Sequence, residues 1–61
     1  MKVEVQFLAH QGMATDTHEA ERVEWEFDEG YASILAGNNE ESLLVVASYP
    51  EHRIVRLRVI S

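Results

Sequence analysis

The chain has no cysteine among its 61 residues, and it has only one proline and three glycines. The absence of cysteine excludes disulfides and thiolate zinc sites, and it leaves the redox compartment open. A domain of this size buries only about 60% of the surface that its unfolded chain exposes. Without disulfides, so short a chain needs very regular packing, self-association or a partner to be stable.

Long apolar runs are also missing. No stretch approaches the roughly 20 apolar residues of a membrane-spanning helix. The first segment, MKVEVQF, alternates polar and apolar residues, whereas a signal peptide would have a basic start and an apolar stretch. We therefore expect no contact with a membrane, and a cytoplasmic protein. With 46% apolar and 26% charged residues, residues 1–61 are expected to form a single globular domain.

Basic residues are scarce, since five lysines and arginines stand against eleven acidic residues, for a formal net charge of −6. The excess lies in residues 1–30, which hold two basic and eight acidic side chains, whereas residues 31–61 hold three of each. A negative field of this kind repels phosphate backbones and attracts basic protein surfaces. The charge pattern thus predicts a protein partner with a basic surface and no direct binding of nucleic acid.

Two segments alternate between apolar and polar residues, residues 2–7 and residues 21–28. A period of two is typical of a half-buried strand, so we expect a strand in each segment. The second strand contains Trp25, the largest apolar side chain, which we place at the centre of the core. Residues 10–19, HQGMATDTHE, have no sustained apolar period and are predicted to form a loop or a ragged hairpin end. The apolar positions expected in the core are Val3, Val5, Phe7, Val23, Trp25 and Phe27.

An antiparallel hairpin of these two strands with Phe7 opposite Val23 would place Glu4 opposite Glu26. Like charges in that position are destabilising, so the acidic strand needs a basic neighbour. The C-terminal segment, residues 53–61, can supply one.

In that segment Arg56 and Arg58 alternate with apolar residues. Placed beside the acidic strand, it would set the two arginines against Glu24 and Glu26 and extend one apolar face. We therefore expect these ion pairs within the sheet.

The middle of the chain allows two interpretations. Residues 31–36 form either a short strand or a turn of helix. Residues 39–50 form either a helix with Asn39 as N-cap, ended by the proline, or a strand that is apolar on both sides. The adjacent Val45 and Val46 favour the strand.

The predicted fold class is therefore all-β, a small antiparallel sheet of about five strands curled into a barrel-like unit. The alternative is a β-β-α-β chain of the α+β class. If the penultimate strand is apolar on both sides, the sheet has to close or be covered by another chain.

Few side chains in the sequence suggest metal binding or catalysis. Two imidazoles and two carboxylates, those of His10, Asp16, His18 and Glu19, could in principle converge on a divalent metal. The preferred interpretation is that these residues cap turns or are solvated, so no metal or cofactor is expected. No nucleophile elbow, phosphate-binding glycine loop or dinucleotide fingerprint is present, and we expect no enzymatic activity.

Two features suggest a partner-binding surface. The segment YPEHR, residues 49–53, brings an aromatic ring, an imidazole and a guanidinium to a turn, a composition enriched at interfaces. The acidic strand and the acidic residues around it form the second feature. The candidate partner-binding residues are Glu19, Glu21, Glu24, Glu26, Glu29, Tyr49 and His52.

The expected function is that of a non-enzymatic protein-interaction module. Its size and charge are typical of small acidic inhibitors encoded by phages or mobile elements. Such a protein occupies a basic or nucleic-acid-binding surface of its partner, as a mimic of nucleic acid. The alternative is a structural subunit that self-associates through a second apolar sheet face, as a homodimer or a larger oligomer.

Overall fold

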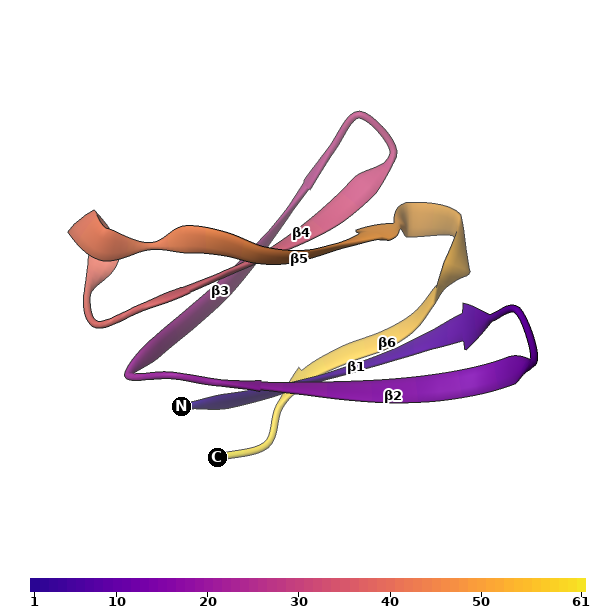
Figure 1. Cartoon of the computed structure of the whole chain (residues 1–61), viewed down its shortest axis with the longest axis horizontal. Coiled ribbons are helices and arrows are strands. Elements are labelled where there is room, and N and C mark those ends of the chain that lie inside the picture. The colour runs from indigo at the N-terminus through magenta and orange to yellow at the C-terminus, as the bar shows by residue number, and fades with distance from the viewer.

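A computed structural model describes all residues, 1–61, and shows six strands in two antiparallel sheets (Figure 1). The first sheet has the order β2-β1-β6 and contains β1 (Lys2–Ala9), β2 (Gly12–Glu19) and β6 (Ile54–Val59). The second has the order β3-β4-β5 and contains β3 (Arg22–Asp28), β4 (Tyr31–Gly37) and β5 (Leu44–Pro50). Two short 3-10 turns flank β5, η1 (Glu40–Ser42) and η2 (Glu51–Arg53). The all-β prediction is confirmed.

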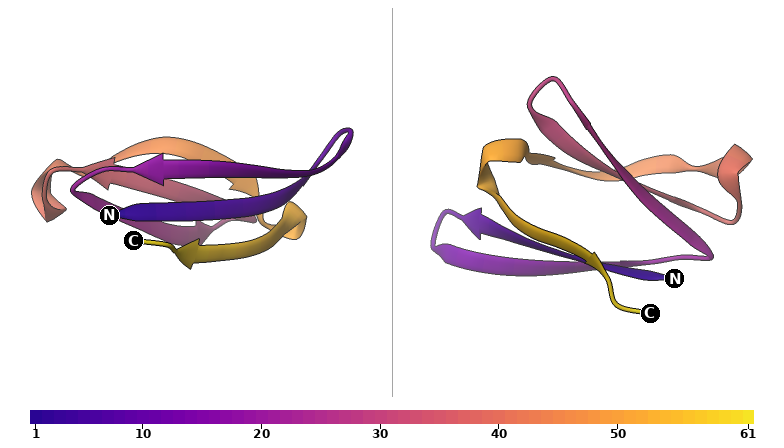
Figure 2. Two further views of the ribbon diagram at one scale, coloured as in Figure 1. Left: turned by 90° about the horizontal axis from the view of Figure 1, so that it is seen from below. Right: turned by 180° about the vertical axis from the view of Figure 1, so that it is seen from behind.

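The two sheets face each other as a narrow sandwich. Strands β2 and β5 lie on one side of it, and β3 and β6 lie on the other (Figure 2). No strand of one sheet is hydrogen-bonded to a strand of the other, so the sandwich is open and does not close into the expected barrel. No helix in the structure is long and apolar enough to cross a membrane.

The core is small. Only six residues are buried, and five of them form one cluster between the sheets. Burial of an aliphatic side chain of this size stabilises the fold by about 1.5–3 kcal/mol, so a cluster of this size leaves a marginal domain. The clustered residues are Val3, Val5, Val23, Ile34 and Tyr49.

Most of residues 10–19 form strand β2, so the prediction of a loop is wrong. β2 pairs along its whole length with β1, from Ala9 opposite Gly12 to Lys2 opposite Glu19. Most of its residues are exposed, because β2 is the edge strand of a sheet only three strands wide. An edge strand with little burial needs no apolar period, and this is why the pattern was missing from the sequence.

The strand at residues 21–28 is confirmed, but its predicted partner is wrong. β3 pairs with β4, with Trp25 opposite Ile34, while β1 lies between β2 and β6. The chain reverses between β3 and β4 through Glu29 and Gly30, at φ 52° and 83°. Two successive residues with positive φ are typical of the turns that join hairpin strands. This local hairpin occupies one edge of β3 and leaves the other edge free.

The predicted ion pairs of the C-terminal strand are also wrong. β6 lies beside β1, and Arg58 Nε is 2.9 Å from Glu4 Oε1, with Arg56 Nη2 4.0 Å from the same oxygen. The arginines therefore neutralise Glu4 and not the carboxylates of β3.

The two aromatic residues of β3 are less buried than predicted. Trp25 packs at the margin of the core cluster, and 51% of Phe27 is exposed. β3 is an edge strand, so no neighbouring strand covers the outer flank of either ring.

The strand interpretation of the middle segment is confirmed for β4 and β5. Asn39 is an N-cap as expected, but of η1, a single 3-10 turn that precedes β5. The apolar start of β5 stays uncovered, because the sheets do not close over it. Its exposed fractions are 72% for Leu44, 60% for Val45 and 54% for Val46.

Candidate functional site: an acidic groove

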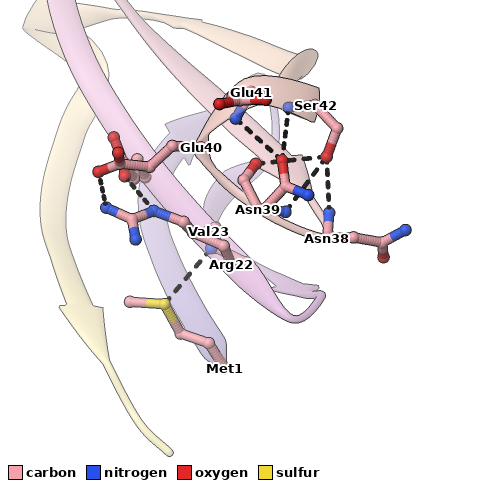
Figure 3. Close-up of polar contacts among 9 residues, drawn as sticks. Met1, Arg22, Val23, Asn38, Asn39, Glu40, Glu41 and Ser42 are labelled. Atoms are coloured by element: carbon pink, nitrogen blue, oxygen red, sulfur yellow. Dashed lines mark hydrogen bonds and ion pairs between the residues drawn. The ribbon is translucent and has the colours of Figure 1, made fainter.

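The groove begins at the turn between β4 and β5 (Figure 3). The Asn39 side chain accepts hydrogen bonds from the backbone N–H of Glu41 at 2.9 Å and of Ser42 at 3.1 Å. The Ser42 hydroxyl oxygen in turn accepts from the backbone N–H of Asn38 and of Asn39, at 3.1 and 3.2 Å. This reciprocal capping fixes the turn and sets its two consecutive glutamates, Glu40 and Glu41, at the surface.

Arg22, the first residue of β3, lies beside this turn. Its Nε donates to Glu24 on the same strand, and its Nη2 donates to Glu40 Oε1 at 2.7 Å. The hydrogen bond to Glu24, together with the charges of both carboxylates, raises the pKa of Arg22. One guanidinium therefore links β3 to η1, and its positive charge is shared between these two carboxylates.

The N-terminus closes one end of the groove. The Met1 ammonium donates to the Ala20 carbonyl oxygen at 2.8 Å, and the Met1 sulfur accepts from the Val23 N–H at 3.3 Å. These contacts hold the first residue against the start of β3 (Figure 3).

The resulting depression is open and has a volume of about 920 Å³. Four carboxylates line it, against one guanidinium and the terminal ammonium group. Two of those carboxylates, Glu21 and Glu41, take part in none of the ion pairs of the chain. The lining residues are Met1, Glu21, Arg22, Val23, Glu24, Asn38, Asn39, Glu40 and Glu41.

The acidic residues that the sequence predicted to bind a partner do not all lie together in the structure. Glu21 and Glu24 line the groove, and Glu24 is paired with Arg22. Glu19 lies opposite Lys2 on the edge strand β2, Glu26 lies opposite Ser33, and Glu29 is in the turn after β3. These three are not in the groove.

Sequence reasoning missed the contribution of residues 38–41. The signal for the turn was present, since Asn39 followed by two glutamates predicted an N-cap. The hairpin of β3 with β4 places this turn next to Arg22, whereas the sequence predicted a hairpin of β3 with β1.

Tyr49 occupies a different kind of site. It is only 7% exposed, and its hydroxyl donates to Asp16 Oδ2 at 2.7 Å. A phenol has a single proton, so the contact of 2.8 Å to His18 Nε2 has to be a hydrogen bond donated by the imidazole. The Phe7 ring packs on the Tyr49 ring, with centroids 4.9 Å apart.

These contacts join β5 of one sheet to β2 of the other. Burial, together with the hydrogen bond to Asp16, raises the pKa of Tyr49 well above its usual range. The tyrosine is thus part of the interior, whereas His52 is exposed in η2. A partner could reach His52 directly, but it could reach Tyr49 only by separating the sheets.

The four residues considered for a metal are not brought together. Asp16 and His18 bind Tyr49, His10 is in the turn after β1, and Glu19 is at the opposite end of β2. Nowhere in the chain do three histidine or carboxylate side chains form a group that could hold a metal ion.

Chemically, the groove offers carboxylate oxygens at an open surface. Such oxygens accept hydrogen bonds from ammonium and guanidinium groups, and they hold them through charge. The groove also lies close to a β3 edge that carries further carboxylates. A scan against protein-family models and searches of curated proteins and of solved structures found no match for this chain.

Proposed function

We propose that this chain is a non-enzymatic protein-interaction module whose acidic groove receives lysine or arginine side chains of a partner protein. The observation that supports this proposal is that two carboxylates of the groove have no basic partner. Arg22 is already shared between two carboxylates, whereas Glu21 and Glu41 line the same depression without a basic partner. A basic segment of another protein would supply the missing positive charges.

The net charge of the chain indicates which class of partner it can bind. At a net charge of −6, nucleic acids and anionic surfaces are repelled, and basic proteins are attracted at long range. If the partner's basic surface itself serves to hold nucleic acid, a bound module would act as an inhibitor by occupying that surface.

Each ion pair of this kind contributes little free energy of binding, and salt weakens it. Exposed ion pairs contribute about 0.2–1 kcal/mol each. Their range is limited to the Debye length, about 10 Å at 0.1 M salt. We therefore expect fast association, and an affinity that depends on several contacts made at once.

The experiment is a titration of a fluorescently labelled arginine- and lysine-rich peptide, followed by anisotropy at low and at high salt. The variant Glu21→Gln/Glu41→Gln removes the two unpaired carboxylates of the groove and should weaken binding about 3- to 10-fold, the equivalent of two exposed ion pairs. The variant Glu19→Gln/Glu29→Gln is the control, because it removes the same charge outside the groove. We expect it to bind almost as tightly as the unmodified chain.

An equal loss of affinity in both variants would show that the peptide senses net charge alone. Binding that is indifferent to salt would contradict the proposal as a whole.

A further inference from the structure

Strands β3 and β6 have complementary side chains, although they belong to different sheets. On β3, Glu26 and Asp28 alternate with the apolar Trp25 and Phe27. On β6, two arginines alternate with apolar residues, Arg56 and Arg58 with Leu57 and Val59. In both strands the apolar residues lie on the face toward the core, and the charged residues lie on the outer face.

The two strands are free edges on the same side of the sandwich. Tyr49 of β5 binds Asp16 of β2, so these two edges form the opposite side. Figure 2 shows β3 and β6 on one side of the sandwich and β2 and β5 on the other. In Figure 1, β3 rises from lower left to upper right and β6 descends from right to lower left, so the two edges run in opposite directions.

The backbone groups at these edges have no strand to bind. On β3, the Val23 N–H points away from β4, since it donates to the Met1 sulfur. The orientation repeats every second residue, so the backbone groups of Trp25 and Phe27 point outward too. On β6, the Ile60 N–H bonds to the Lys2 carbonyl oxygen of β1 at 2.8 Å. The residues that point outward are therefore those of odd number, among them Leu57 and Val59.

We propose that a second copy of this chain covers these edges, with β6 of each copy paired in antiparallel fashion with β3 of the other. A two-fold axis parallel to the strands makes both pairings at once, because the two edges lie on one side and run in opposite directions. The result is a homodimer with two continuous six-stranded sheets.

The free backbone groups limit the register to pairs of odd-numbered residues, and the charges on the outer face select among these registers. Leu57 lies opposite Phe27 of the second copy, and Val59 lies opposite Trp25 of the second copy, as hydrogen-bonded pairs. On the outer face, Arg58 then lies opposite Glu26 of the second copy, and Arg56 lies opposite Asp28 of the second copy.

A register shifted by two residues toward the start of β3 is less favourable. It would use the Val23 N–H, which Met1 already occupies, and Glu24, which already pairs with Arg22. By contrast, neither Glu26 nor Asp28 takes part in an ion pair within the chain. The preferred register also covers two apolar side chains, since Phe27 is 51% and Val59 is 50% exposed.

Pairings of β6 with β6, of β3 with β3 and of β5 with β5 lack this complementarity. Two β6 strands would bring arginines together, and two β3 strands would bring carboxylates together, which is destabilising. β5 has no charged residue, but its pairing with β4 skips Val46. Such a bulge twists an edge strand and interrupts the ladder that a second copy would have to continue.

The test is the molar mass in solution, measured by size-exclusion chromatography with light scattering. The unmodified chain should elute as a species of twice the 7.0 kDa chain mass. Asp28→Arg and Arg56→Asp should each give a monomer, whereas the double variant, which exchanges the two charges, should restore the dimer. Glu19→Arg, the control, makes the same change of charge on β2 at the other side of the sandwich and should leave the dimer intact.

A second measurement uses Trp25, the only tryptophan of the chain. Its emission should shift to longer wavelength when the unmodified protein is diluted, and it should not depend on concentration in folded Asp28→Arg. Far-UV circular dichroism identifies variants that are folded.

Three results would overturn the proposal. The first is an unmodified chain that stays monomeric throughout the micromolar range. The second is a folded double variant that fails to dimerise. The third is a dimer that Val45→Lys on β5 dissociates and Asp28→Arg does not.

Discussion

At the scale of single residues, Tyr49 connects the two sheets more directly than any aliphatic side chain. Its ring belongs to the core cluster, and its hydroxyl binds two side chains of β2 across the sandwich. A buried hydroxyl of this kind stabilises a fold chiefly because its removal would leave polar partners unsatisfied.

We expect Tyr49→Phe to lower the free energy of unfolding by about 1–3 kcal/mol, because Asp16 and His18 lose their common partner. Urea unfolding followed by circular dichroism measures the effect. Tyr31→Phe is the control, since Tyr31 is 52% exposed, and it should change stability by less than about 0.5 kcal/mol. If both variants unfold at the same urea concentration, the hydrogen bonds of Tyr49 do not stabilise the packing of the sheets.

At the scale of elements, the turn between β4 and β5 is the most constrained connection. It has to bring Glu40 of η1 to Arg22 while β5 returns along β4. Gly37 makes this possible, because a Cβ atom there would lie 2.4 Å from the Ser42 carbonyl oxygen. The shape of the groove thus depends on a residue that does not line it.

Gly37→Ala should therefore displace the backbone of η1 and destabilise the chain by about 1–3 kcal/mol, the usual range for overpacking. It should also weaken binding of the basic peptide. Asn38→Ala is the control for stability in the same turn, since only the backbone N–H of Asn38 is used in capping. Thermal unfolding and the peptide titration together check the prediction, and an unchanged Gly37→Ala protein would contradict the described geometry of the turn.

At the scale of the whole molecule, the small core and the uneven charge act together. Five clustered side chains stabilise two sheets whose edges are all free within one chain. The acidic residues lie mainly on β3 and around the groove, whereas the arginines of β6 lie on the first sheet. This separation of charge supports the two proposals, a basic partner and a second copy of the chain.

The stability of the whole chain should also depend on alkaline pH. Tyrosine in an unfolded chain has a pKa of about 10. Burial and the hydrogen bond to Asp16 raise the pKa of Tyr49 in the folded state. Between the two pKa values the folded state holds a proton that the unfolded state has lost, so stability is complete below about pH 10 and falls as the pH rises further.

Urea midpoints measured on both sides of pH 10 should therefore decrease with pH in the unmodified chain. The decrease should be smaller in Tyr49→Phe, which has no phenol to ionise at this position. Parallel losses in the two proteins would assign the alkaline effect to other groups.

The strands were the most predictable part of this protein. Most of β1, β3 and β6 alternates between apolar and polar residues, since each has one face toward the core, and the adjacent valines of β5 favoured a strand. The sequence did not predict β2, because both faces of this strand are largely exposed and burial imposes no period of two on its residues.

Strand pairing was not predictable from the same patterns. The turn at Glu29 and Gly30 commits β3 to β4, and β1 is left to bind β2 and β6. The match between the arginines of β6 and the carboxylates of β3 was visible in the sequence, yet the single chain does not use it. We infer that it belongs between chains.

The order of residues alone thus determines the all-β class, the acidic first half and the faces that each alternating strand presents. These are local properties, set by side-chain type and by a period of two. Which edges meet, which carboxylates Arg22 and Arg58 neutralise, and where a groove opens depend on contacts between residues far apart in the chain. The packing of the two sheets around Tyr49 and its neighbours determines those contacts, and no short segment of the sequence specifies them.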